Sequence, residues 1–78
     1  MTTKAYVLIN VKAGKVKDVV KALVKVKGVK TVHPCWGRPD IFTFVEVPDE
    51  KSLSELVLTQ IHVIEGIQET DTHLIVEA

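Results

Sequence analysis

The stretch VKGVKT at residues 26–31 returns as IEGIQE at residues 64–69, in both cases as an aliphatic residue, a charged residue, a glycine and an aliphatic residue. The two glycines are 38 positions apart, and the same shift places apolar residues on apolar residues elsewhere, as with Tyr6 and Phe44 or Leu23 and Ile61. Two units of 38 residues therefore make up nearly the whole chain. Such an internal repeat indicates that one supersecondary unit occurs twice.

The first unit has the pattern of a strand, a helix and a second strand. Residues 5–11 are rich in strand-forming side chains, and from Val16 to Val24 the apolar residues recur at the spacing of one helix face. Gly28 suits the position just beyond the end of this helix. Residues 29–36 are then expected to form a strand.

The second unit repeats this order. Residues 41–47 predict a strand that ends at Pro48, and Asp49 is a good N-cap for a helix that continues to Ile61. Residues 67–77 predict the last strand. The order of elements is therefore β-α-β-β-α-β.

Two such units joined by a hairpin predict an α+β, ferredoxin-like fold, because right-handed crossovers place both helices on one face of the sheet. The expected sheet is four-stranded and antiparallel, with strand order 4-1-3-2. Side chains alternate along the two central strands, so one aliphatic set packs under the helices. The other set, Tyr6, Leu8, Phe42 and Phe44, is left on the uncovered face. Apolar patches of this kind are rarely left in water, so we expect a homodimer that buries this face.

Length and composition indicate one small globular domain over residues 1–78, with 46% hydrophobic residues and formal net charge zero. A single cysteine excludes an internal disulfide and fits a reducing cytoplasm. The apolar run near the N-terminus is too short for a signal peptide or a membrane span, so we expect no membrane association.

The charges are separated along the sequence. Residues 1–39 carry a net charge of +8 and residues 40–78 a net charge of −8. The basic half alone suggests nucleic-acid binding, but the acidic half lies within the same small domain and cancels much of that field. We therefore expect oppositely charged faces that attract each other or a neighbouring subunit, and assembly beyond the dimer that depends on salt.

The turn Gly37-Arg38-Pro39-Asp40 is the first candidate site. Glycine lets a ligand approach the backbone, proline stiffens the turn, and Asp40 offers a carboxylate that we expect to be exposed. A small-molecule receptor is one interpretation. Ordinary hairpin chemistry is the other, and the turn by itself favours it.

His33, Cys35 and Trp36 are further candidates near this turn. His33 and Cys35 could supply two metal ligands, with the rest coming from a symmetric interface, but a surface histidine and a half-buried cysteine explain them more simply. Trp36 could stack on a ligand or anchor an interface. We expect no metal, no other cofactor and no catalytic residue.

In its order of motifs the chain resembles the effector-binding (RAM) domain of the Lrp/AsnC family of transcriptional regulators. The motifs are Gly-x-x-Asp-hydrophobic before the third strand and Gly-hydrophobic-x-x-Thr-x-Thr in the fourth, at residues 37–41 and 66–72. The resemblance implies dimers that form through the open sheet faces, ring-like higher oligomers, and amino-acid effectors bound between dimers. It implies an effector site made of Gly37, Arg38, Pro39, Asp40, Thr70 and Thr72. In that site the Asp40 carboxylate accepts hydrogen bonds from the effector's ammonium group. Backbone amides and threonine hydroxyls donate hydrogen bonds to the effector's carboxylate.

Full-length members of this family carry an N-terminal helix-turn-helix domain, whereas this chain begins directly with the first strand. We therefore expect no direct nucleic-acid binding and a stand-alone module that senses an effector or assembles with a full-length regulator. The main alternative is an enzyme of the dimeric α+β barrel type, such as a small monooxygenase. An amino-acid-binding ACT-type domain shares the same fold. A copper chaperone is disfavoured because Cys35 lacks the second cysteine of a C-x-x-C loop.

Overall fold

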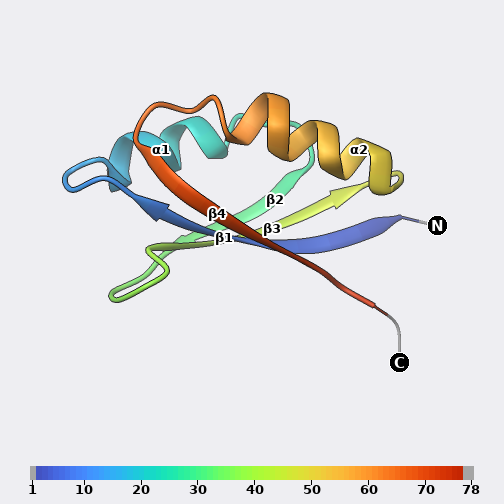
Figure 1. Cartoon of the computed structure of the whole chain (residues 1–78), viewed down its shortest axis with the longest axis horizontal. Coiled ribbons are helices and arrows are strands. Elements are labelled where there is room, and N and C mark those ends of the chain that lie inside the picture. Colours follow the sequence, from blue (N-terminus) through green and yellow to red (C-terminus); the bar gives the residue numbers. More distant parts are fainter. Residues whose placement is uncertain (1, 77–78) are drawn as a thin grey trace.

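The structure is a computed structural model that describes residues 2–76. A single curved sheet carries both helices on one side (Figure 1). The elements in chain order are β1 (Thr3–Val11), α1 (Val16–Leu23), β2 (Val29–Pro34), β3 (Ile41–Val47), α2 (Glu50–Glu55), the π-helical segment η1 (Leu56–Ile61) and β4 (Ile67–Leu74). The predicted β-α-β-β-α-β order is confirmed.

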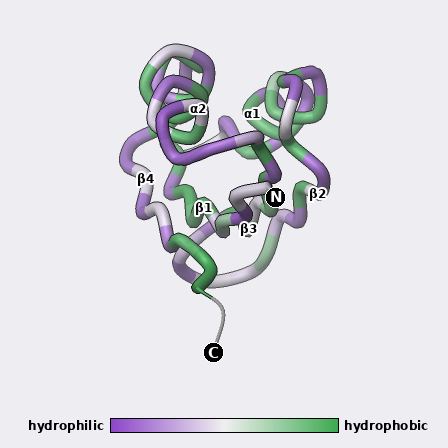
Figure 2. Tube along the Cα trace, turned by 90° about the vertical axis from the view of Figure 1, so that its right-hand side faces the viewer, coloured by the Kyte–Doolittle hydropathy of each residue, from purple (hydrophilic) through white to green (hydrophobic). Residues whose placement is uncertain are grey.

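The sheet has the strand order β2-β3-β1-β4 and every pair is antiparallel. This is the predicted order 4-1-3-2 counted from the other edge. The two central strands, β1 and β3, pair from Thr3 opposite Val47 to Ile9 opposite Ile41. Consequently β2 and β4 form the two edges, with α1 above the β2 side and α2 above the β4 side (Figure 2).

The core lies between the sheet and the helices. Val7 and Ile9 of β1 and Val45 of β3 are fully buried there, together with Val19 and Leu23 of α1. Because successive side chains in a strand point to opposite faces, the residues between them face away from the helices. The fold therefore separates an aliphatic interior from a second sheet face that no element of residues 2–76 covers.

This uncovered face, named the open face below, carries the four residues predicted for it. Tyr6 pairs with Phe44 and Leu8 pairs with Phe42 across the two central strands, and the Tyr6 and Phe44 rings lie 5.4 Å apart in a tilted arrangement. Tyr6 and Phe42 are exposed, and Leu8 and Phe44 are partly exposed. The sequence pattern thus assigned these side chains to the correct face.

The second helix begins as predicted and continues differently. The Asp49 side chain accepts a hydrogen bond from the backbone N–H of Ser52 at 2.8 Å, and this bond lowers the pKa of the Asp49 carboxyl group. From Leu56 the helix widens into η1, where the His62 N–H donates to the Val57 carbonyl, five residues earlier. The wider turn keeps Leu56, Val57 and Ile61 all buried against the sheet.

Two predicted strands are shorter in the structure. β2 ends at Pro34 rather than at Trp36. The Cys35 N–H still donates to the Asp40 carbonyl at 2.8 Å, but the Asp40 N–H donates to Ile9 of β1, so the β2–β3 pairing stops there. β4 ends at Leu74, although the Ile75 N–H still donates to the Lys4 carbonyl. The predicted end of this strand at Glu77 lies outside the described residues.

Among residues 2–76, none of the helices has the length and apolar character needed to span a membrane.

Candidate functional site

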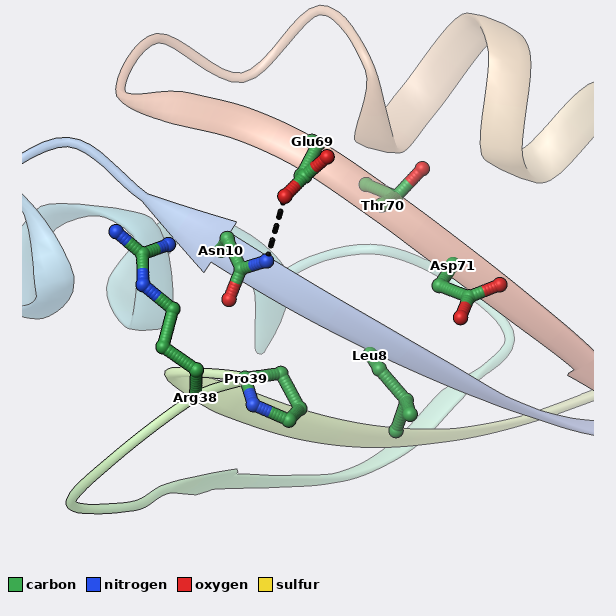
Figure 3. Close-up of a pocket in the computed structure, with 7 residues that line it drawn as sticks. All are labelled: Leu8, Asn10, Arg38, Pro39, Glu69, Thr70 and Asp71. Carbon is green, nitrogen blue, oxygen red and sulfur yellow. Dashed lines mark hydrogen bonds between the residues drawn. The ribbon is translucent and has the colours of Figure 1, made fainter.

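A pocket with a volume of about 400 Å³ lies at the end of the open face, beside the turn between β2 and β3 (Figure 3). Leu8 and Asn10 come from β1, and their cross-strand partners Asp71 and Glu69 come from β4. Cross-strand partners share a face, so all four side chains point away from the helices. The pocket is lined by Leu8, Asn10, Arg38, Pro39, Glu69, Thr70 and Asp71.

Asp40 fastens the turn to the end of β1. Its Oδ2 accepts a hydrogen bond from the Val11 N–H at 2.9 Å, and its own N–H donates to the Ile9 carbonyl at 3.0 Å. The Cys35 N–H donates to its carbonyl. The Asp40 side chain is only 24% exposed, so the expectation of a freely exposed carboxylate is wrong. The reason is that Val11 follows a β-bulge, where its N–H needs an acceptor outside the ladder.

Asn10 presents an unpartnered acceptor in this pocket. Its amide NH2 donates to Glu69 Oε1 at 2.9 Å. A carboxylate only accepts hydrogen bonds, so this contact fixes the amide orientation and turns Oδ1 away from Glu69 (Figure 3). Oδ1 is buried and has no hydrogen-bond partner among residues 2–76. A buried acceptor of this kind is costly unless a donor reaches it.

Charges of opposite sign flank the pocket. The Arg38 guanidinium is on the turn, 3.9 Å from Asp40 Oδ2 at its nearest nitrogen, and its side chain is largely exposed. Glu69 and Asp71 lie across the pocket on β4 (Figure 3). Asp71 Oδ2 also lies 3.0 Å from Nε2 of His73. One cation on one side and two carboxylates on the other complement a small zwitterion.

The structure brings together only part of the predicted site. Arg38, Pro39 and Thr70 line this pocket, and Gly37 and Asp40 flank it in the same turn. Thr70 pairs with the buried Ile9, so its side chain is on the helix side of the sheet, where its hydroxyl is hydrogen-bonded to Nε2 of His62 at 2.7 Å.

Thr72 lies farther along β4, on the same face of the sheet as the Thr70 side chain. It pairs with the buried Val7, so its side chain is on the helix side of the sheet. There it lines a separate pocket of about 260 Å³ with four residues of the second helix, Leu53, Ser54, Val57 and Leu58.

Sequence reasoning missed Asn10, Glu69 and Asp71 as pocket residues and assigned Leu8 only to the dimer face. The available signal was the alternation of polar and aliphatic residues along β1, combined with the strand order that makes β4 its neighbour. Neither signal gives the register between β1 and β4, which decides that Asn10 meets Glu69.

The other candidate residues near the turn are His33, Cys35 and Trp36. Cys35 is exposed, and its nearest partner is the His33 carbonyl, 3.5 Å from Sγ. Within residues 2–76, no three His, Cys, Asp or Glu side chains are close enough to hold a metal ion. Trp36 is 104% exposed in the loop between β2 and β3.

Binding modules and enzymes share a ferredoxin-like sheet with a bare face, so the fold by itself leaves the class of protein open. The family model described as the Lrp/AsnC ligand binding domain matches residues 4–78. The chain belongs to this family, as the motifs predicted.

Known proteins agree with this assignment. Over 71 residues the chain is 32% identical to an uncharacterized HTH-type transcriptional regulator of Pyrococcus horikoshii, and the match covers 91% of this chain and 45% of the regulator. The chain therefore spans less than half the length of this curated relative.

Two solved structures have the same fold. TTHA0845 from Thermus thermophilus superimposes with a TM-score of 0.92 at 28% identity, over 97% of this chain and 95% of that one. The L-methionine complex of the transcriptional regulator NMB0573 from Neisseria meningitidis superimposes with a TM-score of 0.87 at 17% identity, over 96% of this chain and 50% of that one.

Proposed function

We propose that this chain is a cytoplasmic regulatory module that binds a small amino acid, forms homodimers and ring-like higher oligomers, and modulates an Lrp/AsnC-type transcription regulator. The family assignment supports a role in effector binding. The relative from Pyrococcus horikoshii supports a link to transcription, and the methionine complex supports an amino acid as the ligand. In this proposal the partner regulator contacts the DNA.

The proposed effector site is the pocket between the turn and β4. Arg38 binds the carboxylate of the amino acid, and Asn10 Oδ1 and Glu69 accept hydrogen bonds from its ammonium group. The single observation that carries this assignment is the arrangement of charge around the pocket, with Arg38 on the turn and Glu69 and Asp71 on β4. Leu8 and Pro39 supply the apolar part of the wall.

The predicted role of Asp40 stays a hypothesis within this site. Its Oδ2 already accepts a hydrogen bond from the Val11 N–H, so its other oxygen, Oδ1, is the one that contacts the ammonium group in this hypothesis. Thr72 is left out of the proposed site because it faces the helices. The Thr70 side chain also faces the helices, and Gly37 remains at the border of the site.

The effector proposal is tested by calorimetry of the wild-type protein with a panel of amino acids, followed by Arg38→Ala. Removing a charge-assisted hydrogen bond at an exposed position is expected to weaken binding about tenfold or more. Lys30→Ala removes a basic side chain from the same half of the molecule but outside this pocket, and should bind as the wild type does. If no amino acid binds, or if Arg38→Ala binds normally, the proposed site is wrong.

The open face supports the proposed dimer. Four large apolar side chains on a bare sheet exceed what a monomer usually leaves in water. Phe42→Glu places a charge at the centre of this face, and we expect the dimer dissociation constant to rise about 100-fold or more. Val63→Glu, an exposed position away from the sheet, is the matched control. Analytical ultracentrifugation at micromolar concentration measures both, and a monomeric wild-type protein would contradict the dimer.

The interior supports a binding module over the monooxygenase-like alternative. The space between helices and sheet is filled by close-packed aliphatic side chains such as Ile9, Leu23 and Ile61, all fully buried. An enzyme of the dimeric α+β barrel type needs a roomy cleft there with histidine or aromatic groups.

A further inference from the structure

The fold turns the charge separation of the sequence into two oppositely charged sides of the molecule. The segment from α1 through the loop after β2, residues 16–39, has six basic side chains and one acidic one, a net charge of +5. The segment from α2 through β4, residues 50–74, has five acidic side chains and one lysine, a net charge of −4. Figure 2 shows these segments on opposite sides of the central strands.

The basic side also carries an arm, defined here as the loop of residues 35–40. Asp40 clamps its base to β1 through Val11 and Ile9, and the Cys35 N–H closes it. The arm projects beyond the end of the sheet (Figure 1). It carries Trp36, which is fully exposed, and Arg38, which also lines the pocket described above. Tryptophan and arginine are the residues that most often dominate binding at protein interfaces.

The acidic side carries an apolar groove. It lies between the second helix and β4, has a volume of about 260 Å³, and is lined mainly by aliphatic side chains together with Thr72. Leu58 at its edge is 61% exposed. An aromatic side chain would remove this leucine from water and lose its own exposed surface at the same time.

We propose that Trp36 of one copy of this chain inserts into the groove beside Leu58 of a neighbouring copy, with the basic side of the first against the acidic side of the second. A second copy is the occupant because the same chain holds the anchor, the groove and the two complementary charges. The contact uses different surfaces on the two copies, so it repeats around a ring or along a filament. The inference rests on one part of the proposed function, the formation of oligomers larger than the dimer, and is independent of effector binding.

Trp36 is the only tryptophan of the chain, so its fluorescence reports on this contact directly. With rising protein concentration we expect the wild type to form species larger than the dimer in native mass spectrometry. In parallel, the Trp36 emission should shift to the blue and become protected from acrylamide. Higher salt should weaken assembly, since the exposed charges are screened above about 0.15 M.

Two variants and one matched control test the contact. Trp36→Ala and Leu58→Glu should each weaken assembly beyond the dimer by about 30-fold or more. In Leu58→Glu the Trp36 emission should stay that of an exposed indole at every concentration. Val63→Glu is the control, because Val63 is 70% exposed, lies on the same acidic side as Leu58 and does not line the groove. It should assemble as the wild type does, and circular dichroism checks that all three variants are folded.

Three results would overturn the inference. The first is a large assembly in which Trp36 stays accessible to acrylamide, or one that Leu58→Glu leaves intact. The second is a shift of Trp36 emission when an amino acid is added, with no change in the size of the assembly. That result would mean that the indole contacts the effector. The third is a protein that forms no species larger than the dimer at any concentration. Calorimetry of that dimer with amino acids then tests the proposed effector binding separately.

Discussion

Asp40→Ala is expected to lower the melting temperature by about 5–15 °C. The substitution removes the acceptor of the Val11 N–H at the β-bulge and leaves a partly buried donor without a partner. It also frees the base of the loop that carries Arg38 into the pocket. Thermal unfolding at matched protein concentration measures the effect, and an unchanged melting temperature would show that the clamp contributes nothing to stability.

Asp40→Asn separates the structural role of this residue from a role in binding. An asparagine Oδ1 can still accept from the Val11 N–H, so this variant should retain most of the wild-type stability. If Asp40 also contacts the effector's ammonium group, the loss of charge should weaken binding about tenfold. If the variant binds as the wild type does, the ammonium contact lies with Asn10 and Glu69 alone.

Gly66→Ala is expected to lower the free energy of unfolding by about 2–4 kcal/mol. Gly66 has φ +103°, a conformation that side chains rarely adopt, and a Cβ there would lie 2.9 Å from Lys15 Cβ and 3.1 Å from Val19 Cγ2. Val19 is fully buried and cannot move aside. The substitution therefore combines backbone strain with overpacking where the second helix returns to the sheet.

Gly14→Ala is the matched control for this prediction. Gly14 has φ +80°, but a Cβ there would meet no atom within 4 Å. Its cost should be the backbone strain alone, about 1–2 kcal/mol. Urea denaturation of both variants measures the difference. Equal losses would show that the close contact with α1 adds nothing.

The repeat and its periodicities predicted the fold because they report on local geometry and on burial. Apolar spacing distinguished helices from strands, and alternation along β1 assigned Tyr6 and Leu8 to the open face. Asp49 was recognised as a cap because capping needs only a residue three positions later, Ser52, whose N–H it accepts. All of these signals are contained within a few consecutive residues.

The site was predicted only in part, because its contacts join residues far apart in the chain. Asn10 meets Glu69 across 59 positions and Asp40 meets Val11 across 29. The first contact depends on the register between β1 and β4, which shifts at the bulge between Asn10 and Val11. A shift of one residue exchanges the two faces of a strand.

The sequence by itself determined the class of fold, the order of strands, the apolar open face, the family and the turn that borders the pocket. Only the tertiary structure decided that Asp40 is a clamp, that Asn10 keeps an unpartnered oxygen, that the Thr70 and Thr72 side chains lie on the helix side of β4, and that Trp36 is fully exposed. The physical reason is that helix and strand formation follow local spacing, whereas a pocket forms where register, bulges and loop geometry bring distant polar groups together.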